Sequence, residues 1–252
     1  MRVLITLGGT SEKIDDVRSI TNHATGQLGT MIAEAFQKSG AEVDVIASSS
    51  AHKPKESNHL HVTVIQDTHS LNLALTNLLA VHTYDAVIHS MAVSDFTTQT
   101  VYSEEQFLNQ FNQWHQAHPT QELDKETFAS MLGDQLPKKE SKLSSKTDHL
   151  ILVLQKTPKV IQIIKTMQPQ TCLVGFKLLV NVSKEELFQV AEASRKKSHA
   201  DYVLANDLTS IENNQHTGYL LDATGIIAQA ETKQGIAQLI VNQMQNHANQ
   251  GA

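Results

Sequence analysis

The stretch GTMIAEAFQKSGAEVDVIASS, residues 29–49, decides the fold because a helix pattern is followed directly by a strand pattern. Its first apolar residues recur at helical spacing: Met31, Ile32, Ala35 and Phe36. Gly40 then predicts the end of the helix, and EVDVIA (42–47) predicts a strand. Upstream, RVLITL (2–7) is a β-branched apolar run typical of a buried strand. A strand, a helix and a second strand in this order predict a parallel sheet covered by helices.

The same alternation continues along the 252 residues. Further strands are predicted at 62–65, 85–90, 150–155, 172–176 and 202–207. Helices are predicted at 69–82, 158–167, 183–197 and 233–247. The stretch 217–231 predicts a hairpin with Thr224 and Gly225 at its turn. We therefore expect one α/β domain over 1–252, a three-layer Rossmann-like sandwich with a mostly parallel sheet and a ligand beyond the carboxyl ends of its strands.

The region 97–146 differs from this pattern and is interpreted as an insertion, part helix and part lysine-bearing flap. No strand is expected in it. A helix over 103–115 is predicted, with a capping box of Ser103 and Gln106. Its apolar stripe would consist of Phe107, Leu108, Phe111 and Trp114.

Composition excludes several classes of protein. The net charge of -6 gives no basic field for a nucleic-acid backbone. The single cysteine, Cys172, forms no internal disulfide, and the thirteen histidines show no metal-ligand spacing. No apolar run is long enough to span a membrane, and the first ten residues enter a strand pattern instead of a signal peptide. We expect a cytoplasmic protein that binds neither nucleic acid nor membranes.

The loop TNHATG (21–26) precedes the first helix and is the most unusual of the strand ends. Glycines such as Gly8 and Gly26 let backbone N–H groups approach a phosphate, and the following helix points its N-terminus at the site. The alternative for each glycine is a tight turn, with Thr25 capping the helix. Asn22 fits a binding role better, because its amide donates to a carboxylate or acyl phosphate without adding charge.

Two more strand ends carry polar residues. In SMAVSDF (90–96), Asp95 is a candidate ligand for a ribose hydroxyl or a metal, and equally a turn carboxylate. In LANDLT (204–209), Asn206 and Asp207 are by default turn formers. Phe176 ends another strand, where it either stacks on a base or belongs to the core.

Lysines gather at two places. Four lie between 138 and 146, in a stretch that is either a solvated loop or a flap closing over a phosphoryl group. The run RKK (195–197) ends a helix, where cations suit the helix dipole and are also candidates to reach a triphosphate.

Seven segments in order resemble phosphopantothenate–cysteine ligase (phosphopantothenoylcysteine synthetase), the second activity of the bifunctional bacterial coenzyme A flavoproteins. They are GGT (8–10), VRSITNHATGQLG (17–29), AVSDF (92–96), KLSS (142–145), LQKTPKVI (154–161), VGF (174–176) and LAND (204–207). Because Met1 leads directly into the first strand of the ligase, the chain is similar to the stand-alone bacterial form.

The resemblance implies a two-step reaction. CTP in bacterial members, or ATP in eukaryotic ones, activates the carboxylate of 4'-phosphopantothenate as an acyl nucleotidylate. The amine of L-cysteine then displaces the nucleoside monophosphate, and Mg²⁺ accompanies the triphosphate. We expect CTP, with ATP as the less favoured nucleotide.

The resemblance also implies roles for individual residues. Asn22 falls on the catalytic asparagine near the acyl intermediate, and Lys142 on the lysine of the nucleotidyl-transfer step. Nucleotide-binding positions are Gly8, Ala24, Gly26, Gly29, Asp95, Phe176 and Asn206. No metal ligand is assigned.

This chain departs from the family pattern at several of these positions. Gln27 stands where the family usually has lysine or arginine, Ala24 where it has serine, and Lys146 is a possible substitute for a second flap lysine. Which of Arg195, Lys196 and Lys197 reaches phosphate is left open.

The resemblance further implies a homodimer, and the strand at 150–155 is our candidate for its interface. The alternative is an NAD(P)-dependent Rossmann oxidoreductase. Against it, LGGTSEK (7–13) lacks the G-x-G-x-x-G spacing, the second strand ends without an acidic ribose ligand, and no Tyr-x-x-x-Lys pair is evident.

Overall fold

The computed structural model describes residues 1–133, 147–212 and 215–250, which form two compact units. The sheet unit comprises Met1–Thr10, Asn22–Val93 and Lys159–Ala252. The ribbon unit comprises Ser11–Thr21 and Ser94–Pro158.

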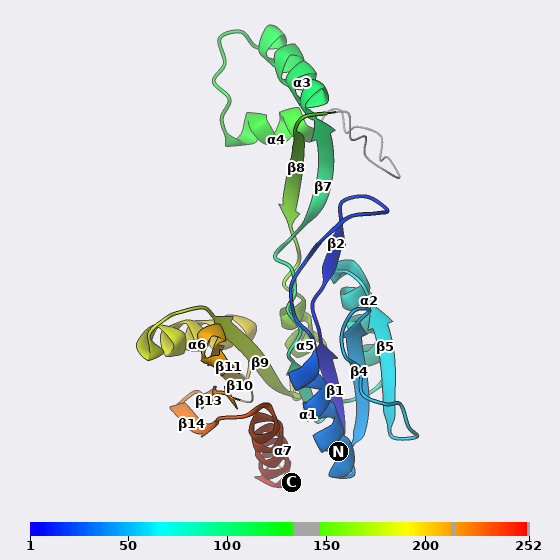
Figure 1. The fold of residues 1–252 in the computed structure, drawn as a ribbon, viewed down its shortest axis with the longest axis vertical. Helices are drawn as coiled ribbons and strands as arrows, with labels where there is room; N and C mark the ends of the chain where they lie inside the picture. The colour runs from blue at the N-terminus through cyan, green and yellow to red at the C-terminus, as the bar shows by residue number, and fades with distance from the viewer. Residues whose placement is uncertain (134–146, 213–214, 251–252) are drawn as a thin grey trace. The chain divides into compact units, whose positions relative to one another are not determined.

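An eight-stranded sheet organises the sheet unit (Figure 1). Its order is β14-β13-β10-β9-β6-β1-β4-β5, and the strands are β1 (Arg2–Leu7), β4 (Glu42–Ser48), β5 (Leu60–Ile65), β6 (Ala86–His89), β9 (Cys172–Leu179), β10 (Tyr202–Asp207), β13 (Gly218–Asp222) and β14 (Gly225–Ala230). The six strands from β5 to β10 are parallel, and β13 and β14 continue the sheet antiparallel. The order of those six is the doubly wound one, so the predicted α/β Rossmann-like fold with a mostly parallel sheet is confirmed.

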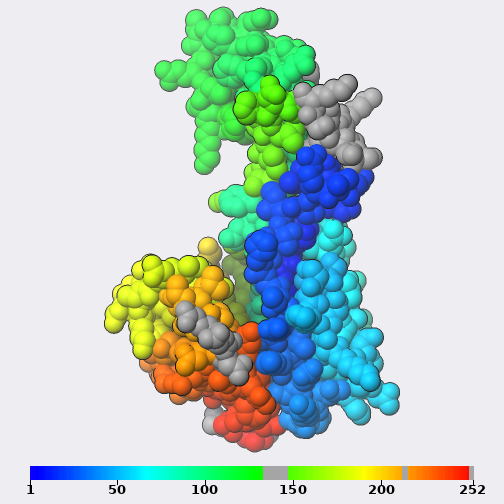
Figure 2. Space-filling view, in the orientation of Figure 1, coloured from blue at the N-terminus to red at the C-terminus, as the bar shows by residue number. Residues whose placement is uncertain are grey.

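Helices cover both faces of this sheet, which confirms the three layers. Helices α1 (Gln27–Lys38) and α7 (Lys233–Gln250) cover one face. Helices α2 (Thr68–Val81), α5 (Val160–Met167) and α6 (Lys184–Ser198) cover the other. The surface view shows α7, coloured red, beside α1, coloured blue (Figure 2).

Elements of the sheet unit that were predicted from local sequence patterns are largely confirmed. The helix predicted from the spacing of Met31, Ile32, Ala35 and Phe36 is confirmed; Ile32 and Phe36 are fully buried, and Met31 is 39% exposed. Gly40, at φ +84°, follows the helix end as expected. The C-terminal hairpin turns at the predicted place, where Gly225 has φ +120°.

Strand β7 (Phe96–Ser103) forms the ribbon unit with β8 (Leu150–Lys156), in a two-stranded antiparallel sheet. The expectation of no strand within 97–146 is therefore wrong. The prediction that 150–155 is a strand is confirmed, but it pairs with β7 outside the main sheet. The threonine-rich sequence of β7 is β-branched and forms a strand once β8 supplies hydrogen-bond partners.

The remaining elements are short or belong to the predicted insertion. They are β2 (Ser11–Lys13), β3 (Ser19–Thr21), α3 (Glu104–Ala117), α4 (Lys125–Gly133), a 3₁₀ turn (Leu208–Ser210), β11 (Ile211–Glu212) and β12 (Gln215–His216). The capping box of Ser103 and Gln106 begins α3 as predicted. Three of the four stripe residues pack against the buried cluster of Tyr102, Met131 and Leu132, whereas Leu108 is 49% exposed, so its predicted place in the stripe is wrong.

Candidate active site

The candidate site lies at the carboxyl edge of the sheet, where β1 and β6 are neighbours. From β1 the chain continues outward to β4 and β5, and from β6 it continues the other way to β9 and β10. The crossovers diverge at this point, which leaves a crevice beyond the strand ends. The loops that follow Leu7 and His89 border this crevice.

The loop after β1 is hydrogen-bonded to the segment after β6. Ala92 N donates to Gly8 O (2.9 Å), and Thr10 N donates to Ala92 O (3.0 Å). Gly8 has φ +90°, and a Cβ there would lie 2.2 Å from Ser48 Oγ. The same hydroxyl accepts from Gly9 N at 3.2 Å. Position 8 therefore requires glycine both for its backbone conformation and for the close approach of β4.

Asn22 is held where these two loops meet. Its backbone N donates to Thr10 O (3.2 Å), and its side-chain Nδ2 donates to Ala92 O (3.2 Å). A Cβ at Gly9 would lie 2.3 Å from Asn22 O, so the two segments are in close contact. A primary amide has two N–H donors and one acceptor. Half-buried Asn22 is thus a fixed, uncharged donor at the crevice.

Glycines bring the start of α1 close to β1. Gly26 is the N-cap of α1 at φ +76°, and a Cβ there would lie 2.9 Å from Ala51 Cβ. A Cβ at Gly29 would lie 2.5 Å from Leu7 Cβ. Half-buried Ala24 lies in the loop between Asn22 and these glycines. Five predicted site positions, from Gly8 to Gly29, are therefore gathered in one place.

The N-terminus of α1 has no side-chain cap. Thr25, the expected cap, has its Oγ1 3.5 Å from Gln27 N, at the limit of a hydrogen bond. Gln27 instead accepts a hydrogen bond from Lys233, with Nζ 2.7 Å from Oε1. The family usually has lysine or arginine at position 27, where this chain has glutamine. The ammonium group of Lys233 therefore lies beside the position at which the family has a cation.

Asn206 and Phe176 lie further along the same edge, on β10 and β9. Asn206 is 6% exposed, and its Nδ2 is 3.0 Å from His216 Nε2. Phe176 is half-buried and packs against the core under α1 and α7. Asp207 accepts from Thr209 N (2.8 Å), which confirms its default role as a turn former, and the bonds that it accepts from Val182 N, Thr209 and Asn181 N lower its carboxyl pKa.

A buried histidine at this edge has no counterpart in the sequence prediction. His89 ends β6, and its Nδ1 lies 2.9 Å from Thr6 Oγ1. Burial lowers the pKa of His89 to about 4, which keeps the imidazole neutral. The only sequence signal for it was a polar residue at the end of an apolar strand.

The cations of 195–197 lie at the opposite edge. Helix α6 returns from the carboxyl end of β9 to the amino end of β10, and Ala200 N donates to Arg195 O (3.0 Å). Arg195 also pairs with Glu192 (2.7 Å), which lowers the pKa of that carboxyl to about 2. Within one chain the topology places Arg195, Lys196 and Lys197 at the other edge of the sheet from the Asn22 loop, and their contact with a triphosphate stays a prediction.

Three residues of the predicted site lie outside the sheet unit or outside the described residues. Asp95 belongs to the ribbon unit, where it is exposed and its carbonyl accepts from Thr157 N (3.0 Å). Lys142 and Lys146 lie outside the described residues. Convergence of the lysine flap on the loop therefore stays a prediction.

Residues 1–133, 147–212 and 215–250 contain no cluster of three or more histidine, cysteine or acidic side chains suited to a metal ion. Within these same ranges, no helix is long and apolar enough to cross a membrane.

Several known proteins, including the following three, are similar to this chain. The coenzyme A biosynthesis bifunctional protein CoaBC of Thermococcus kodakarensis is 30% identical over 215 residues, which are 85% of this chain and 43% of the relative. The chain thus spans less than half of that protein. The solved DNA/pantothenate metabolism flavoprotein of Streptococcus pneumoniae is 35% identical with a TM-score of 0.83, covering 98% of this chain and 99% of that one. A Cab2 mutant in complex with phosphopantothenate-cysteine shares the fold, at 15% identity and a TM-score of 0.69, over 99% of this chain and 86% of that one.

The sequence profile of one family matches residues 1–110 and 132–247. The match includes every described site position, from Gly8 to Asn206, and both strands of the ribbon. The chain therefore belongs to the family of the DNA/pantothenate metabolism flavoprotein C-terminal domain.

Proposed function

We propose that this chain is a phosphopantothenate–cysteine ligase that uses CTP. The observation that carries the proposal is Asn22, a neutral amide fixed against Ala92 O at the switch point of a doubly wound sheet. Membership of a family whose relatives take part in coenzyme A biosynthesis supports it. So does the related fold of Cab2, which was solved with phosphopantothenate-cysteine.

The proposed reaction has two displacements. A carboxylate oxygen of 4'-phosphopantothenate attacks the α-phosphorus of CTP, the bond to the β-phosphate breaks, and pyrophosphate leaves with the electron pair. The amine nitrogen of L-cysteine then attacks the acyl carbon. CMP leaves as the carbon–oxygen bond of the anhydride breaks, and the nitrogen releases a proton to give the amide.

Charge and position determine what the protein contributes to such a reaction. The amide of Asn22 donates to the acyl group without repelling a carboxylate, and the first-turn amides of α1 favour an anion nearby. Lys142 is proposed to neutralise the charge that develops at the α-phosphorus. Asp95, Phe176 and Asn206 are proposed to bind the nucleotide.

Mg²⁺ is proposed to enter with the triphosphate. This ion binds to proteins through one or two carboxylates, with phosphate oxygens and water as its other ligands. A site of that kind needs no cluster of three protein ligands, which agrees with the donor set of the described residues. As a reaction of soluble metabolites, the proposed chemistry fits a cytoplasmic enzyme.

The proposal is tested by pyrophosphate release with 4'-phosphopantothenate and each of the four nucleoside triphosphates, with and without L-cysteine. We expect pyrophosphate with CTP, and phosphopantothenoylcysteine and CMP in equal amounts once L-cysteine is added, detected by mass spectrometry. Release of inorganic phosphate, or the absence of amide with all four nucleotides, would contradict the proposal. No observation favours the oxidoreductase, and titration with NADPH checks it directly.

We also propose that the chain forms a homodimer through the ribbon of β7 and β8. Support comes from two exposed apolar side chains on this ribbon, Phe96 (45% exposed) and Leu154 (39%). Light scattering on the purified protein is expected to give twice the chain mass. Leu154→Glu should give a monomer, whereas Val81→Glu, a change at an exposed position of α2, should leave the dimer intact.

A further inference from the structure

Helix α1 begins with an exposed set of positive partial charges. Its N-cap Gly26 provides no side-chain acceptor, and its first turn contains no acidic residue. The first N–H groups of a helix have no partner within the helix, and they attract anions. In this chain the charge that would normally balance them is missing at a helix of 12 residues.

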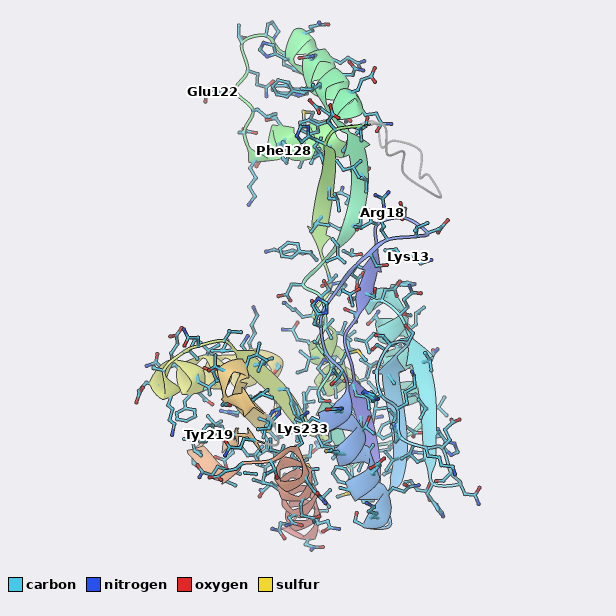
Figure 3. The ribbon with its side chains drawn as sticks, viewed as in Figure 1. Lys13, Arg18, Glu122, Phe128, Tyr219 and Lys233 are labelled. Carbon is cyan, nitrogen blue, oxygen red and sulfur yellow. The ribbon has the colours of Figure 1, made fainter. Side chains whose placement is uncertain are left out.

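Lys233 adds a full positive charge at the same place. It is the first residue of α7, and its only hydrogen bond within the described part of the chain is the one to Gln27 Oε1. No carboxylate among the described residues pairs with it. Figure 3 shows this lysine at the start of α7. An ammonium group has three donors, so two are left for a ligand.

A third group near Lys233 is an unsatisfied, buried donor. His216 is 6% exposed and adjoins the start of α7, because its backbone N donates to Glu231 O (2.8 Å). With Asn206 Nδ2 donating to Nε2, the neutral ring carries its proton on Nδ1. That Nδ1 is buried and has no hydrogen-bond partner. The pKa of His216 is lowered by burial and by the charge of Lys233. A bound anion near Lys233 would offset the effect of the lysine charge on His216.

We propose that Lys233, the first turn of α1 and the His216–Asn206 pair form a phosphate-binding subsite at the carboxyl edge of the sheet. The subsite takes a phosphate group of one of the substrates. This proposal depends on the proposed ligase activity only for the identity of the substrate that carries the phosphate. Lys233 is assigned as a binding residue whose ammonium is positioned by Gln27.

The first experiment measures direct binding by isothermal titration of the full chain with inorganic tripolyphosphate. We expect Lys233→Gln to weaken binding about tenfold, the usual effect of losing one charge-assisted hydrogen bond. Lys233→Arg, which keeps the charge, should bind like the wild type. Lys38→Gln is the matched control, because it removes one exposed lysine from the other end of α1. Equal affinity in Lys233→Gln and Lys38→Gln would overturn the subsite.

The second experiment identifies the source of the phosphate. Raised KM for CTP alone in Lys233→Gln assigns the subsite to the triphosphate, and raised KM for 4'-phosphopantothenate alone assigns it to the phosphate monoester. Unchanged KM for both, in an active variant, overturns the subsite and leaves the ligase standing. Conversely, a wild type that forms no amide but binds tripolyphosphate through Lys233 refutes the ligase and supports the subsite.

Discussion

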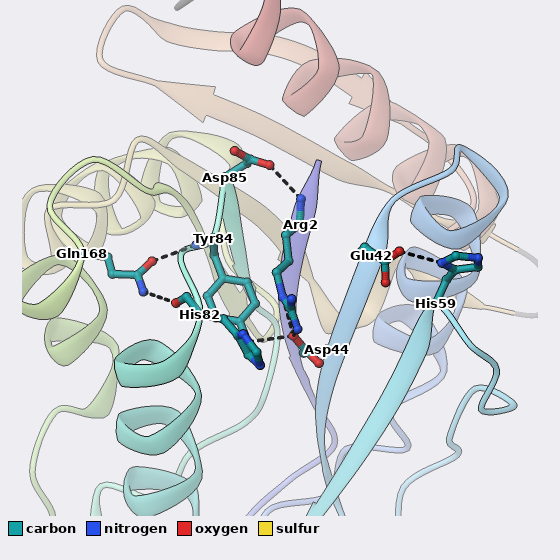
Figure 4. Close-up of polar contacts among 8 residues, drawn as sticks. All are labelled: Arg2, Glu42, Asp44, His59, His82, Tyr84, Asp85 and Gln168. Atoms are coloured by element: carbon teal, nitrogen blue, oxygen red, sulfur yellow. Dashed lines mark hydrogen bonds and ion pairs between the residues drawn. The ribbon is translucent and has the colours of Figure 1, made fainter.

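Two clusters of polar groups at opposite edges of the central sheet differ in how many of their hydrogen bonds are made within the chain. At the carboxyl edge, Asn22 and Lys233 each use one donor, and His216 Nδ1 is buried without an acceptor. At the amino edge, Asp44 is surrounded by donors from two neighbouring elements (Figure 4). The same sheet thus carries a satisfied network at one end and an incomplete one at the other.

The network at the amino edge is built around a single carboxylate oxygen. Asp44 Oδ2 accepts from Arg2 Nε (3.0 Å), from Arg2 Nη2 (2.9 Å) and from the hydroxyl of Tyr84 (2.8 Å). Gln168 accepts from Tyr84 N (3.0 Å) and donates to His82 O (2.6 Å). Groups that already have partners gain nothing from a ligand, so this network stabilises the fold.

The difference indicates which changes should affect reaction rate and which should affect stability. Donors without partners at the carboxyl edge are available to substrates, and their removal should cost little folding free energy. The donors around Asp44 bind only other residues of the chain, and their removal should leave the reaction unchanged.

The largest effect is expected for Asn22→Ala. Loss of a preorganised donor to a developing anion typically lowers the rate by about 10²–10³-fold. We expect this loss in amide formation, with pyrophosphate still released in the first step and little change in thermal stability. Quenched-flow assays of pyrophosphate and amide measure the two steps separately. Equal loss at both steps would show that Asn22 does not act on the acyl intermediate.

Several elements show where sequence reasoning works. The β-α-β start, the Ser103 capping box and the turn at Gly225 depend on residues within a few positions of one another. Local rules such as these are read directly from a single chain. These rules were sufficient to predict the fold class and to predict that the Asn22 loop lies near the glycines.

The errors come from partners distant in sequence. Strand β7 needed β8, which begins 54 residues after the first residue of β7. Lys233 and Gln27 are 206 residues apart, and no local sequence pattern predicts their hydrogen bond. Each error concerns a contact that only the tertiary fold creates.

The largest stability effect is expected at the amino edge, for Asp44→Ala. Removal of one partner from a buried ion pair leaves Arg2 and the Tyr84 hydroxyl without their acceptor, at a cost of about 3 kcal/mol in the free energy of unfolding. Urea denaturation measures it. Glu42→Ala is the control, because Glu42 pairs with His59 on an exposed surface and should cost less than about 1 kcal/mol. Similar costs for both variants would contradict a special role of the Asp44 network in stability. A lowered kcat in folded Asp44→Ala would contradict the prediction that this network takes no part in the reaction.

His89 should make the carboxyl edge sensitive to pH. Its folded pKa is about 4, below the ordinary 6.5, so the unfolded chain binds more protons between these values. Stability is therefore complete above about pH 6.5 and falls as the pH decreases, by about 2 kcal/mol at pH 5 for this one group. The difference in unfolding free energy between the wild type and His89→Gln should change by that amount from pH 7.5 to pH 5. A difference independent of pH would mean that His89 has the same pKa in the folded and the unfolded protein.

The smallest effect is expected for Tyr84→Phe. The change removes one hydroxyl that donates to Asp44 while the two Arg2 donors remain, so it should cost about 1 kcal/mol in the free energy of unfolding. Burial and the Asp44 carboxylate raise the pKa of Tyr84, so the hydroxyl stays a donor and the cost should be independent of pH up to pH 10. In the Asp44→Ala background the same change should cost almost nothing, because the acceptor is already absent. A cost that persists there would show that the Tyr84 hydroxyl stabilises the edge through a contact other than its hydrogen bond to Asp44.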